Sequence, residues 1–114
     1  MRIAVVGTCS SGKSTIVDRL RERGFDAYAV SQEHSIIPRL WDHQHPDALV
    51  YLQVDYQTVQ RRRGANWPRW IYDLQIERLR DAREHATLTL DTGELGVDQT
   101  VQRIIEALGP ESRP

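Results

Sequence analysis

Lysine, cysteine and long apolar runs are scarce in this chain of 114 residues, and each scarcity limits the classes of fold and function that fit the sequence. The single cysteine cannot form an internal disulfide, so we expect the reducing cytoplasm rather than an oxidising compartment. No apolar run approaches the roughly 20 residues that cross a bilayer, and we expect no membrane partner. Because Met1 and Arg2 lead straight into the first apolar segment, we also expect no signal peptide.

Charge of one sign is not in surplus either. The net charge is −1 and charged residues make up 27% of the chain, so we expect no nucleic-acid partner. The length suits one small domain. We place that domain at residues 1–109 and expect a disordered tail at residues 110–114.

One stretch organises the sequence, and it begins directly after the apolar residues 3–6. Residues 7–14 complete the pattern G-x-x-x-x-G-K-[ST], which forms a phosphate-binding loop between a strand and a helix. Gly7 and Gly12 permit turns that let successive backbone N–H groups point at phosphate oxygens, and the following helix directs its positive dipole end at the same anion. Lys13 is the only lysine among 15 basic residues, at the position where a compact ammonium suits the phosphates. The pattern predicts a site for ATP or another nucleoside triphosphate with Mg²⁺.

Roles within this loop follow from the residue types. The Lys13 side chain is expected to reach the β- and γ-phosphates, and the Ser14 hydroxyl is the expected Mg²⁺ ligand. Cys9 is expected to contribute backbone and no chemistry, although exposure beside a helix N-terminus could make it oxidisable. The residues expected to contact the nucleotide are Gly7, Thr8, Cys9, Ser10, Ser11, Gly12, Lys13, Ser14 and Thr15.

Apolar, β-rich runs alternate with amphipathic segments along the chain. We expect strands at about residues 3–6, 25–30, 48–54 and 87–90, and helices at about residues 13–23, 56–63, 68–86 and 97–108. This alternation predicts a parallel α/β sheet of about four strands in the order 2-1-3-4, with helices on both faces in three layers. In the third helix, a stripe that includes Ile71, Leu74 and Leu79 is expected to face inward, and Arg80 is expected to pair with Glu84.

The loop and two later stretches resemble the small P-loop kinases, which include gluconate, shikimate, adenylylsulfate and nucleoside kinases. Residues 49–55, followed by residues 58–62, are similar to the strand before the arginine-bearing lid of these kinases, and residues 88–92 resemble their terminal strand and loop near the adenine. The resemblance implies a P-loop NTPase-like fold and phosphoryl transfer from Mg-ATP to a small-molecule hydroxyl. The sequence departs from the pattern between residues 30 and 48, where no apolar run could form the strand that carries the acidic Walker B position.

Polar residues outside the loop complete the expected site. Glu33 follows the second strand at the ligand-binding edge of the sheet, and is a candidate general base or indirect Mg²⁺ ligand; a solvated loop glutamate is the alternative. Arg61 and Arg62 precede a glycine break that permits a closing lid, so at least one is expected to contact nucleotide or acceptor phosphate. Thr92 is expected to border the base. Asp55 could coordinate the metal, although capping of the following helix explains it without chemistry.

These observations predict a cytoplasmic kinase in which Lys13 and Arg62 stabilise the transferred phosphoryl group and Glu33 orients an unidentified small-molecule acceptor. The alternative is a nucleotide-dependent binding or regulatory module with slow or no hydrolysis, which the missing Walker B strand favours. The open edges of a four-stranded sheet also allow a homodimer that covers one of them.

Overall fold

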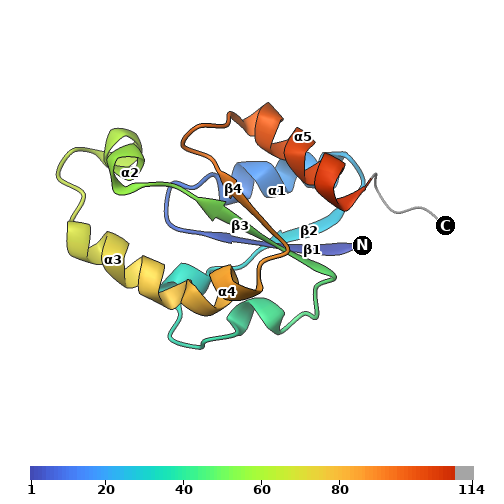
Figure 1. Cartoon of the computed structure of the whole chain (residues 1–114), viewed down its shortest axis with the longest axis horizontal. Helices are drawn as coiled ribbons and strands as arrows, with labels where there is room; N and C mark the ends of the chain where they lie inside the picture. The colour runs from blue at the N-terminus through green and yellow to red at the C-terminus, as the bar shows by residue number, and fades with distance from the viewer. Residues whose placement is uncertain (110–114) are drawn as a thin grey trace.

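A parallel sheet of four strands forms the middle of the structure, a computed structural model that describes residues 1–109 (Figure 1). The expected tail at residues 110–114 lies outside the described residues. The strands are β1 (Arg2–Gly7), β2 (Asp26–Ala29), β3 (Ala48–Gln53) and β4 (Leu88–Asp91). Their order is β2-β1-β3-β4 and every neighbouring pair is parallel, which confirms the expected fold class and strand order.

The central strands β1 and β3 are buried because helices cover both faces of the sheet. Successive side chains of a strand point to opposite faces, so Ile3 and Val5 of β1 pack in one core and Ala4 and Val6 in the other. The first core is covered by α1 (Lys13–Glu22) and α5 (Val97–Leu108), as Figure 1 shows. The opposite face carries α3 (Arg69–Arg78), α4 (Arg80–His85) and two short 3-10 helices, η1 (Gln32–His34) and η2 (Leu40–Asp42).

The helix α2 (Tyr56–Arg63) follows β3 at the carboxyl end of the sheet and has the bounds expected from the sequence. Asp55 caps its start, because its Oδ1 accepts a hydrogen bond from the Thr58 backbone N–H at 2.8 Å. The capping interpretation of Asp55 is therefore confirmed. Hydrogen bonds from the side chain and the backbone of Thr58 hold the pKa of the Asp55 carboxyl below its ordinary value.

The expectation of one continuous helix at residues 68–86 is wrong. Leu79 ends α3 and begins α4, with its backbone N–H shared between the carbonyls of Gln75 and Ile76 at 3.0 and 3.2 Å. The break buries the Leu79 side chain completely, whereas Leu74 of the expected inward stripe is exposed. Arg80 consequently pairs with Glu77 in the preceding turn, and the expected pair with Glu84 is not formed.

The segment between β2 and β3 contains η1 and η2, and within the described residues no strand is formed there. This agrees with the absence of an apolar run between residues 30 and 48. The buried side chain of Gln32 organises the segment: it donates to the Ile37 carbonyl at 2.6 Å and accepts from the Trp41 N–H at 3.0 Å. None of the helices in residues 1–109 combines the length and the apolarity that a bilayer crossing requires.

Candidate functional site

The loop between β1 and α1 folds into a tight concave turn at the carboxyl end of the sheet. Ser10 and Gly12 adopt left-handed conformations, with φ of 66° and 93°. Gly7 is needed for a different reason: a Cβ there would lie 2.5 Å from Ser11 Oγ and 2.8 Å from the Leu52 carbonyl oxygen. Gly12 thus serves the turn, as expected, whereas Gly7 serves a close approach of the backbone.

The concave side of this loop is a hollow of about 230 Å³, lined by Thr8, Ser10, Ser11, Gly12, Lys13, Ser14 and Thr15. The first backbone N–H that donates inside α1 is that of Ile16, which reaches the Gly12 carbonyl at 3.0 Å. The N–H groups of the preceding helical residues have no intrahelical partner, as at every helix start. The hollow therefore combines free backbone donors with the positive end of the α1 dipole, and this combination attracts anions.

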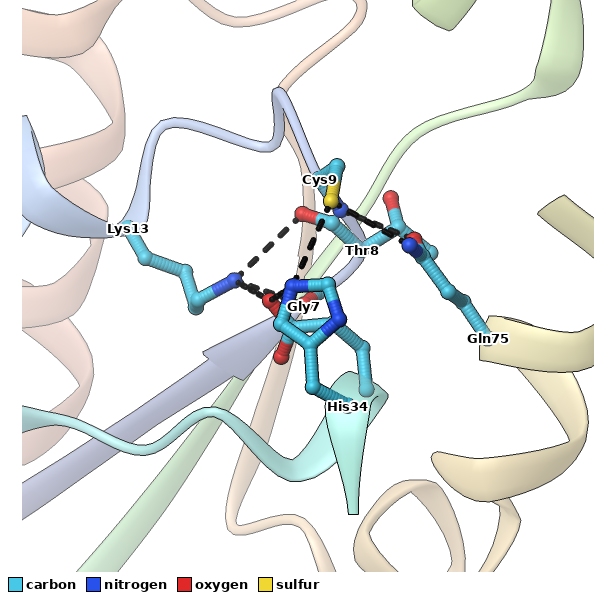
Figure 2. A network of polar contacts seen from close by, with 7 residues as sticks. Gly7, Thr8, Cys9, Lys13, His34 and Gln75 are labelled. Carbon is cyan, nitrogen blue, oxygen red and sulfur yellow. Dashed lines mark hydrogen bonds and ion pairs between the residues drawn. The ribbon is translucent and has the colours of Figure 1, made fainter. Parts of the chain in front are cut away.

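The Lys13 side chain folds back over the loop that bears it. Its ammonium lies 2.9 Å from the Gly7 carbonyl oxygen, 3.5 Å from that of Thr8 and 2.5 Å from Glu33 Oε2 (Figure 2). The side chains of the Lys13–Glu33 pair are 13% and 4% exposed, so the pair is largely shielded from water. Shielding strengthens the attraction between the charges and makes either one costly to leave alone.

Glu33 reaches this position because η1 continues from the carboxyl end of β2, next to β1 in the sheet. Its residue exposure is 3%, which rules out the interpretation as a solvated loop glutamate. Its second carboxylate oxygen, Oε1, is buried and has no hydrogen-bond partner. The hydroxyls of Thr8 and Ser11 are likewise buried without partners. Several polar atoms around Lys13 are therefore left available to a ligand.

On one side of the loop lies a cavity of about 450 Å³, which we call the Arg62 cavity; its walls include Ser10, Thr15, Ile16, Arg62, Thr92, Leu95 and Val97. Arg62 lines it and donates to the Ser10 carbonyl at 2.6 Å and to the Thr92 carbonyl at 2.6 Å. The buried Thr92 hydroxyl donates to the Ser11 carbonyl at 2.8 Å. These bonds fasten the β4–α5 connection to the loop.

On the other side of Lys13 lies a cavity of about 480 Å³, which we call the Glu33 cavity; its walls include Cys9, Glu33, His34, Arg63, Trp67, Gln75 and Arg78. Within residues 1–109, neither Arg63 nor Arg78 forms an ion pair, and Arg63 stacks over the Trp67 ring at 4.4 Å. The cavity wall therefore carries cations in excess of the neutralised Lys13–Glu33 pair.

The structure separates the two arginines that the sequence proposed together. Arg62 reaches the loop, whereas the Arg61 guanidinium donates to the Thr58 hydroxyl at 3.0 Å and lines neither cavity. Ser14 and Thr15 are exposed at the start of α1, and both residues line the hollow.

Sequence reasoning missed Gln75 and Arg78, and it gave Cys9 no side-chain contact. Gln75 is 4% exposed in α3, accepts a hydrogen bond from the Cys9 backbone N–H at 3.0 Å and donates to Cys9 Sγ at 3.2 Å (Figure 2). The Cys9 sulfur also lies 3.6 Å from His34 Nε2. A glutamine on the buried side of an amphipathic helix was the only available signal, and it did not indicate a partner.

No protein-family model matches the chain, and a search of curated proteins finds no match. The description of the molecule consequently rests on its own structure: a parallel α/β protein with a concave, lysine-bearing loop and two cavities beside it.

Proposed function

We propose that this protein binds a nucleoside triphosphate with Mg²⁺, with the phosphates in the hollow of the β1–α1 loop. The observation that carries the proposal is the Lys13 ammonium at a concave backbone turn that only glycine at position 7 permits. The unpartnered hydroxyls of Thr8 and Ser11 and the free N–H groups of α1 are donors of the kind that a polyphosphate accepts. The residues present thus fit an anionic ligand.

Each part of the ligand has a matching part of the site. The exposed Ser14 hydroxyl would hold Mg²⁺, which favours oxygen ligands and keeps several waters. The Arg62 cavity, with apolar walls at Ile16, Leu95 and Val97, would take the nucleoside. The proposal covers ATP and other nucleoside triphosphates alike.

We further propose phosphoryl transfer to the hydroxyl of a small molecule seated in the Glu33 cavity. Glu33 takes the hydroxyl proton, and the acceptor oxygen forms its bond to the γ-phosphorus as the bond to the nucleoside diphosphate breaks. Lys13 leaves Glu33 and stabilises charge on the transferred group; Mg²⁺ held at Ser14 would neutralise phosphate charge. Arg62, which lies on the nucleoside side, positions the loop through its two carbonyl contacts.

One observation favours a second candidate, a nucleotide-dependent binding or regulatory module that hydrolyses slowly or not at all. Within residues 1–109, no strand between β2 and β3 brings a further carboxylate to the start of α1. Asp55, the candidate replacement, is engaged as the cap of α2. A Mg²⁺ ion held by few protein ligands supports binding more readily than fast turnover.

The remaining parts of the proposal concern location and partners. The single cysteine is in keeping with the reducing cytoplasm. The proposed partners are the nucleotide and the acceptor, with no role for nucleic acid or membrane. The edge strands β2 and β4 leave room for a homodimer formed by edge pairing.

The test is ADP release from Mg-ATP, with GTP in parallel, against a panel of sugars, nucleosides and small alcohols. Lys13→Ala and Ser14→Ala should abolish release, whereas Ser31→Ala, an exposed serine without a capping hydrogen bond, should not. Acceptor-dependent release supports the kinase, and slow release that is indifferent to the acceptor supports the regulatory module. Release that survives in the Lys13 and Ser14 variants, or no release together with no nucleotide binding, contradicts the proposal.

A further inference from the structure

We propose that Cys9, Glu33 and His34 form a binding site for a divalent transition-metal ion of the Zn²⁺ type, distinct from the Mg²⁺ position at Ser14. One ligand atom from each residue lies within 4.8 Å of the others, and this is the only such group in residues 1–109. The set combines a thiol, an imidazole and a carboxylate, which are the three side-chain ligands that Zn²⁺ takes in proteins. Sulfur and nitrogen ligands select against Mg²⁺ and Ca²⁺, which prefer oxygen.

The distances agree with tetrahedral coordination. Bonds to zinc of about 2.3 Å from sulfur and about 2.0–2.2 Å from nitrogen or oxygen place neighbouring ligand atoms about 3.4–3.6 Å apart. His34 Nε2 lies 3.6 Å from Cys9 Sγ and 3.6 Å from Glu33 Oε2. Two edges of the tetrahedron are thus present before any ion binds, and the third pair of atoms, in Cys9 and Glu33, lies within 4.8 Å and would draw together around the ion.

The ligands are held in place by residues around them. Gln75 fixes Cys9 through the backbone N–H and donates to its sulfur, as Figure 2 shows. A donor to a ligating sulfur is the kind of outer contact that orients metal ligands and stabilises the thiolate. Gln32 fixes the 3-10 turn that carries Glu33 and His34, through its bonds to Ile37 and Trp41.

Two further observations indicate a ligand here. Glu33 is 3% exposed and its Oε1 has no partner, so the carboxylate has unused capacity in a buried position. All three residues line the Glu33 cavity, and His34 is exposed. An ion can therefore enter from the cavity, and a fourth coordination position open to it would remain for water, as in zinc sites with three protein ligands.

Lys13 is the competitor for this site, because its ammonium lies 2.5 Å from the same Glu33 oxygen that faces His34. A metal ion on Oε2 must displace the ammonium, which keeps the carbonyls of Gly7 and Thr8 as acceptors. The ion then supplies the positive charge that the buried carboxylate needs. The inference does not depend on nucleotide binding, because it uses side chains that are in place without one.

The experiment is titration of the whole chain with Co²⁺, a spectroscopic substitute for Zn²⁺, in the absence of nucleotide. We expect one Co²⁺ per chain, a near-ultraviolet absorption band from thiolate to cobalt, and loss of the band when Zn²⁺ is added. Proton release should accompany binding, because the thiol must deprotonate. Zn²⁺ should also raise the melting temperature of the wild-type protein.

Cys9→Ser should abolish the thiolate band, and His34→Asn should weaken Co²⁺ binding at least about tenfold. His43→Asn, an exposed histidine outside the cluster, should change neither. The inference is overturned if the wild-type protein shows no thiolate band, or if Cys9→Ser and His34→Asn bind Co²⁺ as tightly as the wild type. Because nucleotide is left out, a failure here leaves the proposed Mg-nucleotide site standing.

Discussion

The hollow of the β1–α1 loop is lined by Lys13 and the Glu33 cavity by the ion-pair partner of Lys13, yet the two spaces are built in different ways. The hollow is lined by residues from one stretch, Thr8 to Thr15, and its shape comes from backbone turns. The Glu33 cavity takes its walls from the loop, from η1, from the end of α2 and from α3. Its chemistry comes from side chains that only the complete fold brings together.

This difference determines how each region should respond to substitution. The shape of a hollow made of backbone depends on conformation, so a substitution at Gly7 should distort it, whereas substitutions at Lys13 and Ser14 should remove ligand contacts and leave the shape unchanged. A cavity made of side chains depends on particular charges, and single polar substitutions there should alter chemistry without altering the fold. The following predictions are ordered from the largest expected effect to the smallest.

Glu33→Gln should lower the rate of transfer to an acceptor in the Glu33 cavity and leave nucleotide binding in the hollow unchanged. Loss of the proton acceptor should lower the acceptor-dependent rate by about 10²–10⁴-fold, while the Kd for Mg-ATP stays within about threefold. Steady-state kinetics and calorimetry measure the two quantities. Glu84→Gln, an exposed glutamate on α4, is the matched control. Equal losses in rate and affinity would show that the two regions are one functional unit.

Lys13→Met should destabilise the fold as well as the site, because it leaves the buried Glu33 carboxylate without its counter-charge. We expect the free energy of unfolding to fall by about 3 kcal/mol at neutral pH. The double variant Lys13→Met/Glu33→Gln should recover most of this loss, because no charge is then buried alone. Denaturant titration of the four proteins in this cycle provides the test, and simple additivity of the two substitutions would contradict the interpretation.

Gly7→Ala should distort the hollow, because the new Cβ would lie 2.5 Å from Ser11 Oγ and 2.8 Å from a strand carbonyl. We expect a loss of about 2 kcal/mol in unfolding free energy, together with weaker nucleotide binding. Gln102→Ala, at an exposed position of α5 that lines neither the hollow nor either cavity, is the control and should leave nucleotide affinity unchanged. If Gly7→Ala bound Mg-ATP normally, the close approach would not be required.

Arg62→Gln should weaken nucleotide affinity about fivefold, corresponding to about 1 kcal/mol, because it removes the two bonds that fasten the loop to the β4–α5 connection. Arg61→Gln is the matched control, because that guanidinium contacts Thr58 instead. We expect its affinity to equal that of the wild type. A larger effect at Arg61 would mean that α2 turns differently in the bound state.

Asp55→Ala should give the smallest effect, a lower melting temperature through loss of the α2 cap, with Asp55→Asn close to the wild type. The pKa of Asp55 is lower in the folded state than in the unfolded chain. The carboxylate therefore contributes fully to folding stability at pH values above the pKa of the unfolded chain. This contribution is lost as the pH falls below about 4, through the folded pKa. Melting curves of wild type and Asp55→Ala should therefore converge in acid. A difference that grows in acid would contradict this sign.

Much of the fold could be predicted because β1 and β3 are continuous apolar strands and the intervening helices have clear apolar stripes. Right-handed crossovers then leave few strand orders. The break at Leu79 could not be predicted, because burial of that side chain depends on how α3 and α4 pack on the sheet. Local propensity alone favoured one helix there.

The arrangement of the candidate site could likewise be predicted only in part. The loop is local, and the sheet-edge rule was enough to bring Glu33 towards it. The choice between Arg61 and Arg62 was not, because neighbouring helical residues point about 100° apart and only the orientation of α2 decides which one faces the loop. The contacts of Gln75 and His34 with Cys9 join residues 66 and 25 positions apart, and no sequence pattern connects them.

The most direct test of the account is calorimetric titration of the whole chain with Mg-ATP and Mg-GTP, compared with Ser14→Ala and Lys13→Ala. The account predicts saturable binding of one nucleotide per chain, weakened at least about tenfold by either substitution and dependent on Mg²⁺ in the wild type. Absence of binding by the folded wild-type protein, or binding that is indifferent to both substitutions, would contradict it.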